Sequence, residues 1–123
     1  MPFNSINNTQ EFANIINSGR VVVVDFYANW SLWSQYSTQQ FSDFSETFKR
    51  IGVDFCRVDV DELEDVAMEA DVRVVPTFMV FKDGKKVGYA EGVDSGNLHK
   101  LMGSHVAGWT VRVPPSTKEL RAV

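Results

Sequence analysis

A seven-residue apolar run near the start of the chain constrains the fold more than any other feature of the sequence. Residues 21–27 read Val-Val-Val-Val-Asp-Phe-Tyr and are rich in β-branched and aromatic side chains. Such a run is typical of a strand that is covered on both faces. From Trp33 onward the period changes, and large apolar residues recur on one helical face: Phe41, Phe44, Phe48 and Ile51. The sequence therefore predicts a central strand followed by a long helix.

The segments around this strand–helix unit predict a parallel sheet. Residues 8–11, Asn-Thr-Gln-Glu, resemble a capping box that opens a helix, and Gly19 is the expected stop. Residues 53–60 alternate in character and predict a second strand. Asp61 is expected to cap the next helix, whose apolar stripe is Leu63, Val66, Ala67 and Ala70. Strand–helix–strand order predicts a right-handed parallel crossover.

The C-terminal part predicts an antiparallel addition to this sheet. Residues 77–81 are expected to form a third strand, and Asp83-Gly84 is a strong turn signal before a partner strand over residues 86–91. Ser95 is the expected cap of a last helix, with its inward side chains at Leu98, Leu101, Met102 and Val106. We expect one α/β domain over residues 1–106, with a mixed sheet and helices on both faces. Residues 107–123 are expected to form a separate tail.

Five short motifs stand along the chain in a defined order. They are Val23-Val24-Asp25-Phe26-Tyr27-Ala28-x-Trp30, Arg57-Val58-Asp59-Val60-Asp61-Glu62, Val75-Pro76-Thr77-Phe78, Lys82-Asp83-Gly84-Lys85 and Gly92. In this order and spacing they resemble the thioredoxin family over roughly residues 3–106. The resemblance implies a thioredoxin-like fold, a cis peptide bond before Pro76, and protein-disulfide reduction as the activity of the family.

The two positions that carry the redox cysteines in this family are serines here. The family motif is Trp-Cys-x-x-Cys, whereas this chain reads Trp30-Ser31-Leu32-Trp33-Ser34. Disulfide exchange needs a thiolate and a second thiol, and serine hydroxyls supply neither. Dithiol catalysis through Ser31 and Ser34 is therefore not expected.

A different use of Ser31, as the nucleophile of a hydrolase, needs a base such as histidine beside it. His99 and His105 both fall in the last predicted helix, and neither aligns near Ser31. The simpler interpretation is that Ser31 accepts a backbone hydrogen bond at the start of the long helix.

Asp25 places a carboxylate inside the apolar run, which is costly unless the group is paired, hydrogen-bonded or protonated. The resemblance implies that Asp25 is buried beneath the active site, where the family uses this aspartate for proton transfer. Burial raises the pKa of a carboxyl group, and Arg57 nearby opposes that shift. With no thiol to deprotonate, we expect a buried Asp25–Arg57 pair. Together with the serines, these residues occupy the catalytic positions of the scaffold.

The resemblance also implies a shallow apolar groove for substrate peptides, formed by Trp30, Trp33, Val75, Pro76, Gly92 and Val93. A cis bond before Pro76 leaves the backbone of Val75 free to pair with an extended peptide. In the alternative arrangement, Trp33 folds back and covers this surface.

Composition limits the kinds of partner and location. A net charge of −4 gives no basic footprint for nucleic acid, and no apolar stretch is long enough to span a membrane. Cys56 is the only cysteine, so we expect a buried structural thiol, no intrachain disulfide and a cytoplasmic location. The N-terminus lacks the pattern of a secretory signal. His99 and His105 form no metal-ligand cluster, and no cofactor is expected.

Two interpretations of function remain open. In one, the parent protein is a disulfide reductase, and Ser31 and Ser34 were introduced in place of its cysteines. In the other, the chain is a natural thioredoxin-like binding module that has lost redox chemistry, which Leu32-Trp33, Gln39 and the long tail favour. Both predict client proteins or peptides in the groove and a monomer or weak homodimer. A thioredoxin reductase is a partner only of a cysteine-containing parent.

Overall fold

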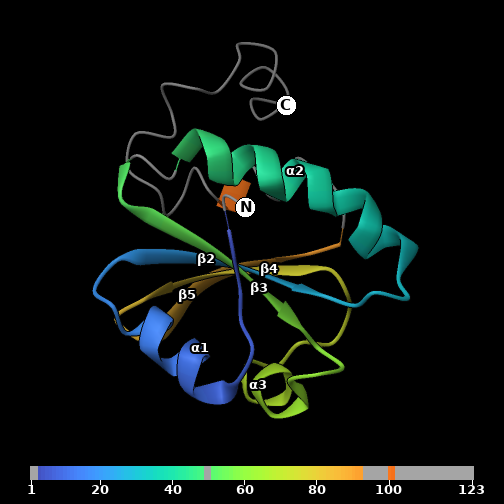
Figure 1. The fold of residues 1–123 in the computed structure, drawn as a ribbon, viewed down its shortest axis with the longest axis horizontal. Coiled ribbons are helices and arrows are strands. Elements are labelled where there is room, and N and C mark those ends of the chain that lie inside the picture. Colours follow the sequence, from blue (N-terminus) through green and yellow to red (C-terminus); the bar gives the residue numbers. More distant parts are fainter. Residues whose placement is uncertain (1–2, 49–50, 93–99, 102–123) are drawn as a thin grey trace.

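The computed structural model describes residues 3–48, 51–92 and 100–101. Within these residues the chain forms an alternating series of strands and helices (Figure 1). In order they are β1 (Asn4–Ser5), α1 (Thr9–Ile16), β2 (Val21–Tyr27), α2 (Leu32–Phe48), β3 (Val53–Asp59), α3 (Glu64–Glu69), β4 (Thr77–Lys82) and β5 (Lys85–Glu91).

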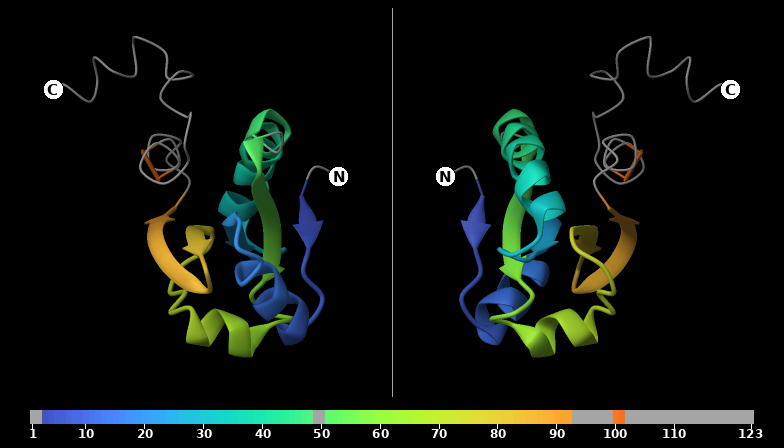
Figure 2. Two further views of the ribbon diagram at one scale, coloured as in Figure 1. Left: turned by 90° about the vertical axis from the view of Figure 1, so that its left-hand side faces the viewer. Right: turned by 90° about the vertical axis from the view of Figure 1, so that its right-hand side faces the viewer.

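The five strands form one mixed sheet in the order β1-β3-β2-β4-β5. Strands β1, β3 and β2 are parallel, whereas β4 runs antiparallel to β2 and β5 runs antiparallel to β4. Figure 2 shows β1 and β5 at opposite edges of this sheet. The mixed sheet predicted from the sequence is confirmed, with β2 at its centre.

Helices cover both faces of the sheet, with α2 on one face and α1 and α3 on the other (Figure 1). Because side chains alternate along a strand, successive residues of β2 enter different cores. Val23 packs on the α2 face, where the Phe41 ring centroid lies 5.6 Å from Phe55 and 5.9 Å from Phe78. Val24 packs on the opposite face, in the cluster that contains Phe12 of α1. Asp25 consequently points toward α2.

Local signals explain several of these boundaries. Asn8 caps α1, because its side chain accepts a hydrogen bond from the Glu11 backbone N–H at 2.9 Å. The turn between β4 and β5 has positive φ at both Asp83 and Gly84, as a tight hairpin turn requires. The predicted helix start and hairpin are therefore confirmed. The return bond differs from that of a capping box, because the Glu11 carboxylate accepts the backbone N–H of Asn7 rather than that of Asn8.

Two expectations about local structure are wrong. Ile51 does not extend the apolar face of α2, because the helix ends at Phe48 and Ile51 is 53% exposed beyond it. Asp61 does not cap α3: the Asp59 carboxylate accepts hydrogen bonds from the backbone N–H groups of Asp61 and Glu62 instead. Asp59 is the last residue of β3, so its carboxylate can reach forward over the turn that follows the strand.

Strand β1 has no counterpart in the sequence-based prediction. It is two residues long and pairs with Cys56 and Arg57 of β3, while its neighbours Phe3 and Ile6 are buried on opposite faces of the sheet. Two residues are too few to show a period. Of the last predicted helix, Leu101 is buried in the α2-side core, whereas its other marker residues and the tail over residues 107–123 lie outside the described part.

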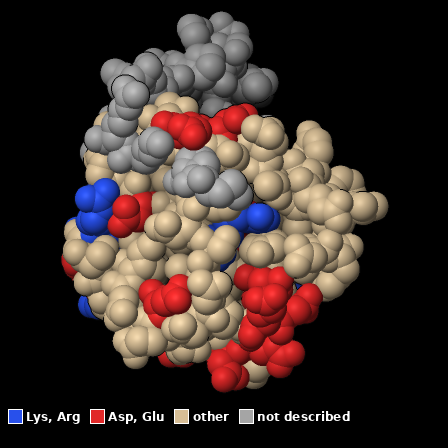
Figure 3. Space-filling view, in the orientation of Figure 1, with Lys and Arg blue, Asp and Glu red and all other residues tan. Residues whose placement is uncertain are grey.

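Acidic side chains are unevenly distributed on the surface. Figure 3 shows a group of them at the lower right, over α3 and the loop that leads into it. The exposed carboxylates of this segment are Asp61, Glu62, Glu64, Asp65, Glu69 and Asp71. In the same view, uncharged surface borders this group above and to the right, and basic atoms lie above it near the centre of the face.

Candidate functional site

The candidate site lies at the end of the sheet where β2 meets α2. The parallel register places Tyr27 of β2 beside Asp59 of β3, and the antiparallel register places Phe26 beside Thr77 of β4. The backbone N–H of Gly92 then donates to the carbonyl of Pro76 at 2.9 Å. Sheet pairing therefore gathers the β2–α2, β3–α3 and α3–β4 connections at one end of the molecule.

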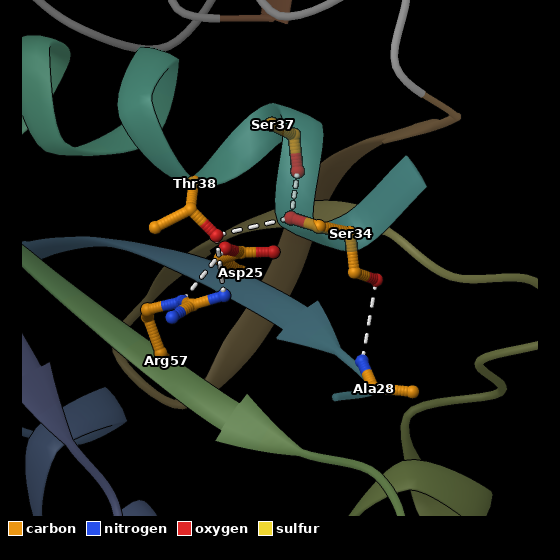
Figure 4. Close-up of polar contacts among 6 residues, drawn as sticks. All are labelled: Asp25, Ala28, Ser34, Ser37, Thr38 and Arg57. Carbon is orange, nitrogen blue, oxygen red and sulfur yellow. Dashed lines mark hydrogen bonds and ion pairs between the residues drawn. The ribbon is translucent and has the colours of Figure 1, made fainter. Parts of the chain in front are cut away.

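Ser31 and Ser34 are buried and serve as hydrogen-bond acceptors. Ser31 precedes α2, and its Oγ accepts the backbone N–H of Ser34 at 3.2 Å. The Oγ of Ser34 accepts the backbone N–H of Ala28 at 3.2 Å, across the turn from β2 (Figure 4). The first contact is the cap expected from the sequence, while the second was not foreseen. Both hydroxyls therefore fix the turn that carries the chain from strand to helix.

A chain of polar contacts continues from the Ser34 carbonyl into the protein. The hydroxyls of Ser37 and Thr38 both donate to this carbonyl at 3.0 Å. The Thr38 hydroxyl also accepts a hydrogen bond from the Arg57 guanidinium at 3.1 Å. The start of α2 is thus linked to a charged group that projects from β3 (Figure 4).

Asp25 and Arg57 form the expected ion pair beneath α2. The Arg57 Nε lies 3.0 Å from Asp25 Oδ2, Asp25 is completely buried, and the Arg57 side chain is mostly buried. The guanidinium carbon also lies 3.7 Å from the centroid of the Tyr27 ring, within cation–π distance. The other carboxylate oxygen of Asp25, Oδ1, is buried with no hydrogen-bond partner. The carboxylate is therefore only partly compensated for its loss of water.

The electrostatics of Asp25 follow from this incomplete compensation. Burial raises the pKa of Asp25 from 3.8 to about 6, and the charge and hydrogen bond of Arg57 oppose the rise. The group can therefore gain or lose a proton near neutral pH. Asp25 is therefore a candidate proton acceptor. The two serine positions, however, hold no thiol from which it could take a proton.

The only cysteine lies on the other face of the sheet. Cys56 is fully buried in the core formed with α1 and α3, as expected. Burial, with the nearby charges of Asp54 and Asp25 as smaller contributions, raises the pKa of the Cys56 thiol. The thiolate needed for exchange is therefore strongly disfavoured.

Four large side chains form an exposed surface at the start of α2, which we call the aromatic patch. They are between 64% and 76% exposed: Trp30, Leu32, Trp33 and Tyr36. Leu32 and Tyr36 lie one turn apart, as do Trp33 and Tyr36, so the helix presents them together. Trp33 does not fold back onto the protein. Leu32 and Tyr36 were not among the expected groove residues, although their helical spacing from each other is a readable signal.

The loop before β4 contributes backbone rather than side chains. The Val75–Pro76 peptide bond is cis, Val75 is half-buried and Pro76 is buried. Within the described residues, no hydrogen bond uses the backbone N–H or carbonyl of Val75. Gly92 is half-buried with a φ of 90°. Val93, the remaining expected groove residue, lies outside the described part of the chain.

One hydrogen bond ties the aromatic patch to the connection between β3 and α3, residues 60–63, which we call the acidic loop. The Trp30 indole Nε1 donates to Asp61 Oδ2 at 2.8 Å. Asn29 makes a second link, from its side-chain amide to Asp59 Oδ2 at 3.2 Å. The β2–α2 and β3–α3 connections are therefore held side by side.

Neither a metal site nor a membrane span is found in the part of the chain that the structure describes. No cluster of three or more His, Cys, Asp and Glu side chains is arranged to hold a metal ion there. No described helix combines the length and apolar character needed to cross a bilayer.

Comparison with known proteins agrees with this architecture. The family model described as Thioredoxin matches residues 4–104. The chain belongs to the thioredoxin family. A thioredoxin of Coprinus comatus is 35% identical over 102 residues, which is 83% of this chain and 96% of the relative. Thioredoxin-1 of Saccharomyces cerevisiae is 35% identical over 95 residues, covering 77% of this chain and 90% of the relative.

A solved structure of the family has a similar fold. The crystal structure of Malassezia sympodialis thioredoxin has a TM-score of 0.81 and 32% identity, covering 85% of this chain and 91% of the other. The thioredoxin-like fold expected from the sequence is thereby confirmed.

Proposed function

We propose that this chain is a thioredoxin-family protein that binds segments of client proteins at the aromatic patch and does not exchange disulfides. One observation carries the proposal. Ser31 and Ser34 stand where the family motif has its two sulfurs, and both hydroxyls are buried and accept backbone hydrogen bonds. The scaffold is retained, and the atoms of the exchange reaction are absent.

The chain offers no alternative thiol for this reaction. Exchange requires a thiolate to form a bond to one sulfur of a disulfide while the other sulfur departs, and then a second thiol to release the product. Cys56 is the only thiol, and it is buried on the face of the sheet opposite Asp25. The family activity therefore belongs to the scaffold rather than to this chain.

The binding function rests on the surface beside the serines. The four side chains of the patch expose an area on the order of 500 Å², comparable to the largest apolar patch of a typical soluble monomer, which is often functional. The backbone of Val75, which pairs with no other described residue, offers a donor and an acceptor to an extended segment. A client segment in this position is anchored by apolar side chains on the patch and by backbone hydrogen bonds.

Binding can be tested with a fluorescein-labelled synthetic peptide of extended, apolar sequence. Trp33→Ala should weaken its affinity about 5- to 30-fold, because exposed aromatic anchors dominate such contacts. Met68→Ala is the matched control, since Met68 is also a large exposed apolar side chain (77% against 64% for Trp33) but lies on α3 outside the patch. Equal affinity of the two variants would show that the patch is not the contact surface.

A second candidate function, disulfide reduction by a cysteine form, is favoured by Asp25. Its buried carboxyl, with a pKa of about 6, is suited to accept a proton from a thiol above it. If the serines were introduced into a reductase, the double variant Ser31→Cys/Ser34→Cys should gain dithiol-dependent reductase activity. A natural binding module should respond weakly, because Leu32-Trp33 replaces the usual Gly-Pro between the cysteines. As a control, Cys56→Ala is added to both the unmodified protein and the double variant, which removes the unrelated thiol.

A further inference from the structure

The acidic loop before α3 borders the aromatic patch and supplies a charge that the patch lacks. Asp61 accepts the indole N–H of Trp30 at 2.8 Å, so the carboxylate and the ring share one hydrogen bond. Glu62, Glu64 and Asp65 follow directly and are exposed. In Figure 3 the acidic group is contiguous with the uncharged surface to its upper right.

Among the residues that the structure describes, these carboxylates pair with no cation. The chain carries no lysine or arginine between Arg57 and Arg73, and Arg73 is paired with Asp71 at 3.1 Å. Within the described residues, no ion pair involves Asp61, Glu62, Glu64 or Asp65. The negative charge at this edge of the patch is therefore available to an external group.

Local structure accounts for only part of this charge. Glu64 and Asp65 lie in the first turn of α3, where negative charge favours the helix. Asp61 and Glu62 precede the helix, and Asp59 already accepts their backbone N–H groups. The fold of this loop therefore gives Glu62 no structural task, and gives Asp61 only the task of holding Trp30.

We propose that the occupant of the aromatic patch is a protein segment with lysine or arginine next to a large apolar side chain, a specificity that rests on the binding function proposed above. The apolar side chain lies on Leu32, Trp33 and Tyr36. The cation lies between the face of the Trp30 ring and the carboxylates of Asp61 and Glu62. The indole N–H is already bonded to Asp61, so Trp30 presents its ring with a fixed orientation.

Charge favours this occupant over a second copy of the chain. A symmetric dimer through the patch brings two acidic groups together, and each copy carries a net charge of −4. A basic segment meets the same surface with opposite charge. Opposite charge at the rim of an interface raises the rate of association and makes binding depend on salt.

Two synthetic peptides test the proposal. They share one apolar centre, flanked by lysines in the first peptide and by glutamates in the second, and binding is followed by fluorescence anisotropy. The lysine peptide should bind about 5- to 10-fold more tightly at low salt, as expected for one or two exposed charge pairs. The preference should shrink as salt rises from about 50 mM to about 500 mM, because the screening length falls.

Matched variants assign the effect to this loop. Glu62→Gln/Glu64→Gln should remove most of the preference, whereas Asp43→Asn/Asp83→Asn, which changes the net charge equally at exposed positions on α2 and in the β4–β5 turn, should preserve it. Thermal melting checks that both variants fold. If both peptides bind with equal affinity, the proposed specificity is wrong and the binding function stands. If neither peptide binds, the binding function fails as well, and self-association of the chain at high concentration would identify a second copy as the occupant.

Discussion

The two faces of the central sheet are filled in different ways. Beneath α1 and α3 the core is apolar, and it contains Phe26 and Cys56 without an ionised group. Beneath α2 a second apolar core lies beside the buried Asp25–Arg57 pair, which is linked to the serine turn through Thr38. Strand β2 supplies both faces by alternation. The difference shows that a costly polar group is buried on the face that lies below Ser31 and Ser34, where the sequence supplies no thiol.

The largest expected effect tests whether the apolar parts of the two faces are equivalent. Phe26→Ala on the α1 face and Phe41→Ala on the α2 face each truncate a fully buried ring. Both should lower the free energy of unfolding by about 3–5 kcal/mol, measured by urea denaturation. A loss below about 1 kcal/mol for either variant would show that its face is loosely packed.

The next effect concerns Asp25, the ionisable group that distinguishes the α2 face of the sheet from the opposite face. Because the folded pKa of Asp25 is about 6 and its ordinary value is 3.8, the folded state binds this proton more tightly than the unfolded state. The contribution to stability is complete below about pH 4, declines as pH rises toward 6, and is lost above that. Relative to Asp25→Asn, the unmodified protein should therefore lose about 2 kcal/mol between pH 4 and pH 7.

Denaturation of both proteins across this range measures the difference. Asn retains an oxygen that can accept from Arg57, so the comparison mainly isolates the charge. A rise in the relative stability of the unmodified protein toward neutral pH would mean that Arg57 outweighs the burial of the carboxylate.

The sequence predicts most of the fold and fewer of the site contacts. Residues 21–27 predict the central strand because every side chain of the run except Asp25 is apolar or aromatic. Both faces of a strand with this sequence can therefore be covered. Ser31 is recognisable as a cap from its place between strand and helix. These are local signals that a few neighbouring residues carry.

Contacts between distant segments explain what could not be predicted. The Trp30–Asp61 bond joins residues in two connections and depends on how both loops close. Asp59 and Asp61 have the same side chain two positions apart, and only the path of the chain after β3 decides which one caps the turn. The exposure of Trp33 depends on whether another segment packs against it, and the sequence pattern does not indicate this.

A smaller effect tests the serine turn itself. Ser34→Ala leaves the backbone N–H of Ala28 without its acceptor, and Ser31→Ala does the same to the N–H of Ser34. Each should cost about 1 kcal/mol of stability in thermal or urea denaturation. Ser42→Ala on the outer part of α2 is the control, and an equal effect there would show that the two buried hydroxyls have no special part in the turn.

The smallest effect concerns an exposed charge pair remote from the site. Arg20 Nε lies 2.9 Å from Asp54 Oδ2, and both side chains are partly exposed. Arg20→Gln should change the free energy of unfolding by less than about 1 kcal/mol, because exposed pairs are screened by water and salt. A larger loss would show that surface charges contribute as much as the buried pair on the α2 face.

The central claim is that the scaffold of a disulfide reductase here lacks the atoms for exchange. Its most direct test is turnover of a protein disulfide by the unmodified chain, with Cys56→Ala measured alongside and dithiothreitol as the source of electrons. We expect both proteins to leave the rate at the level of dithiothreitol alone. Catalysis above that level by the Cys56→Ala protein would contradict the claim, because that chain contains no thiol.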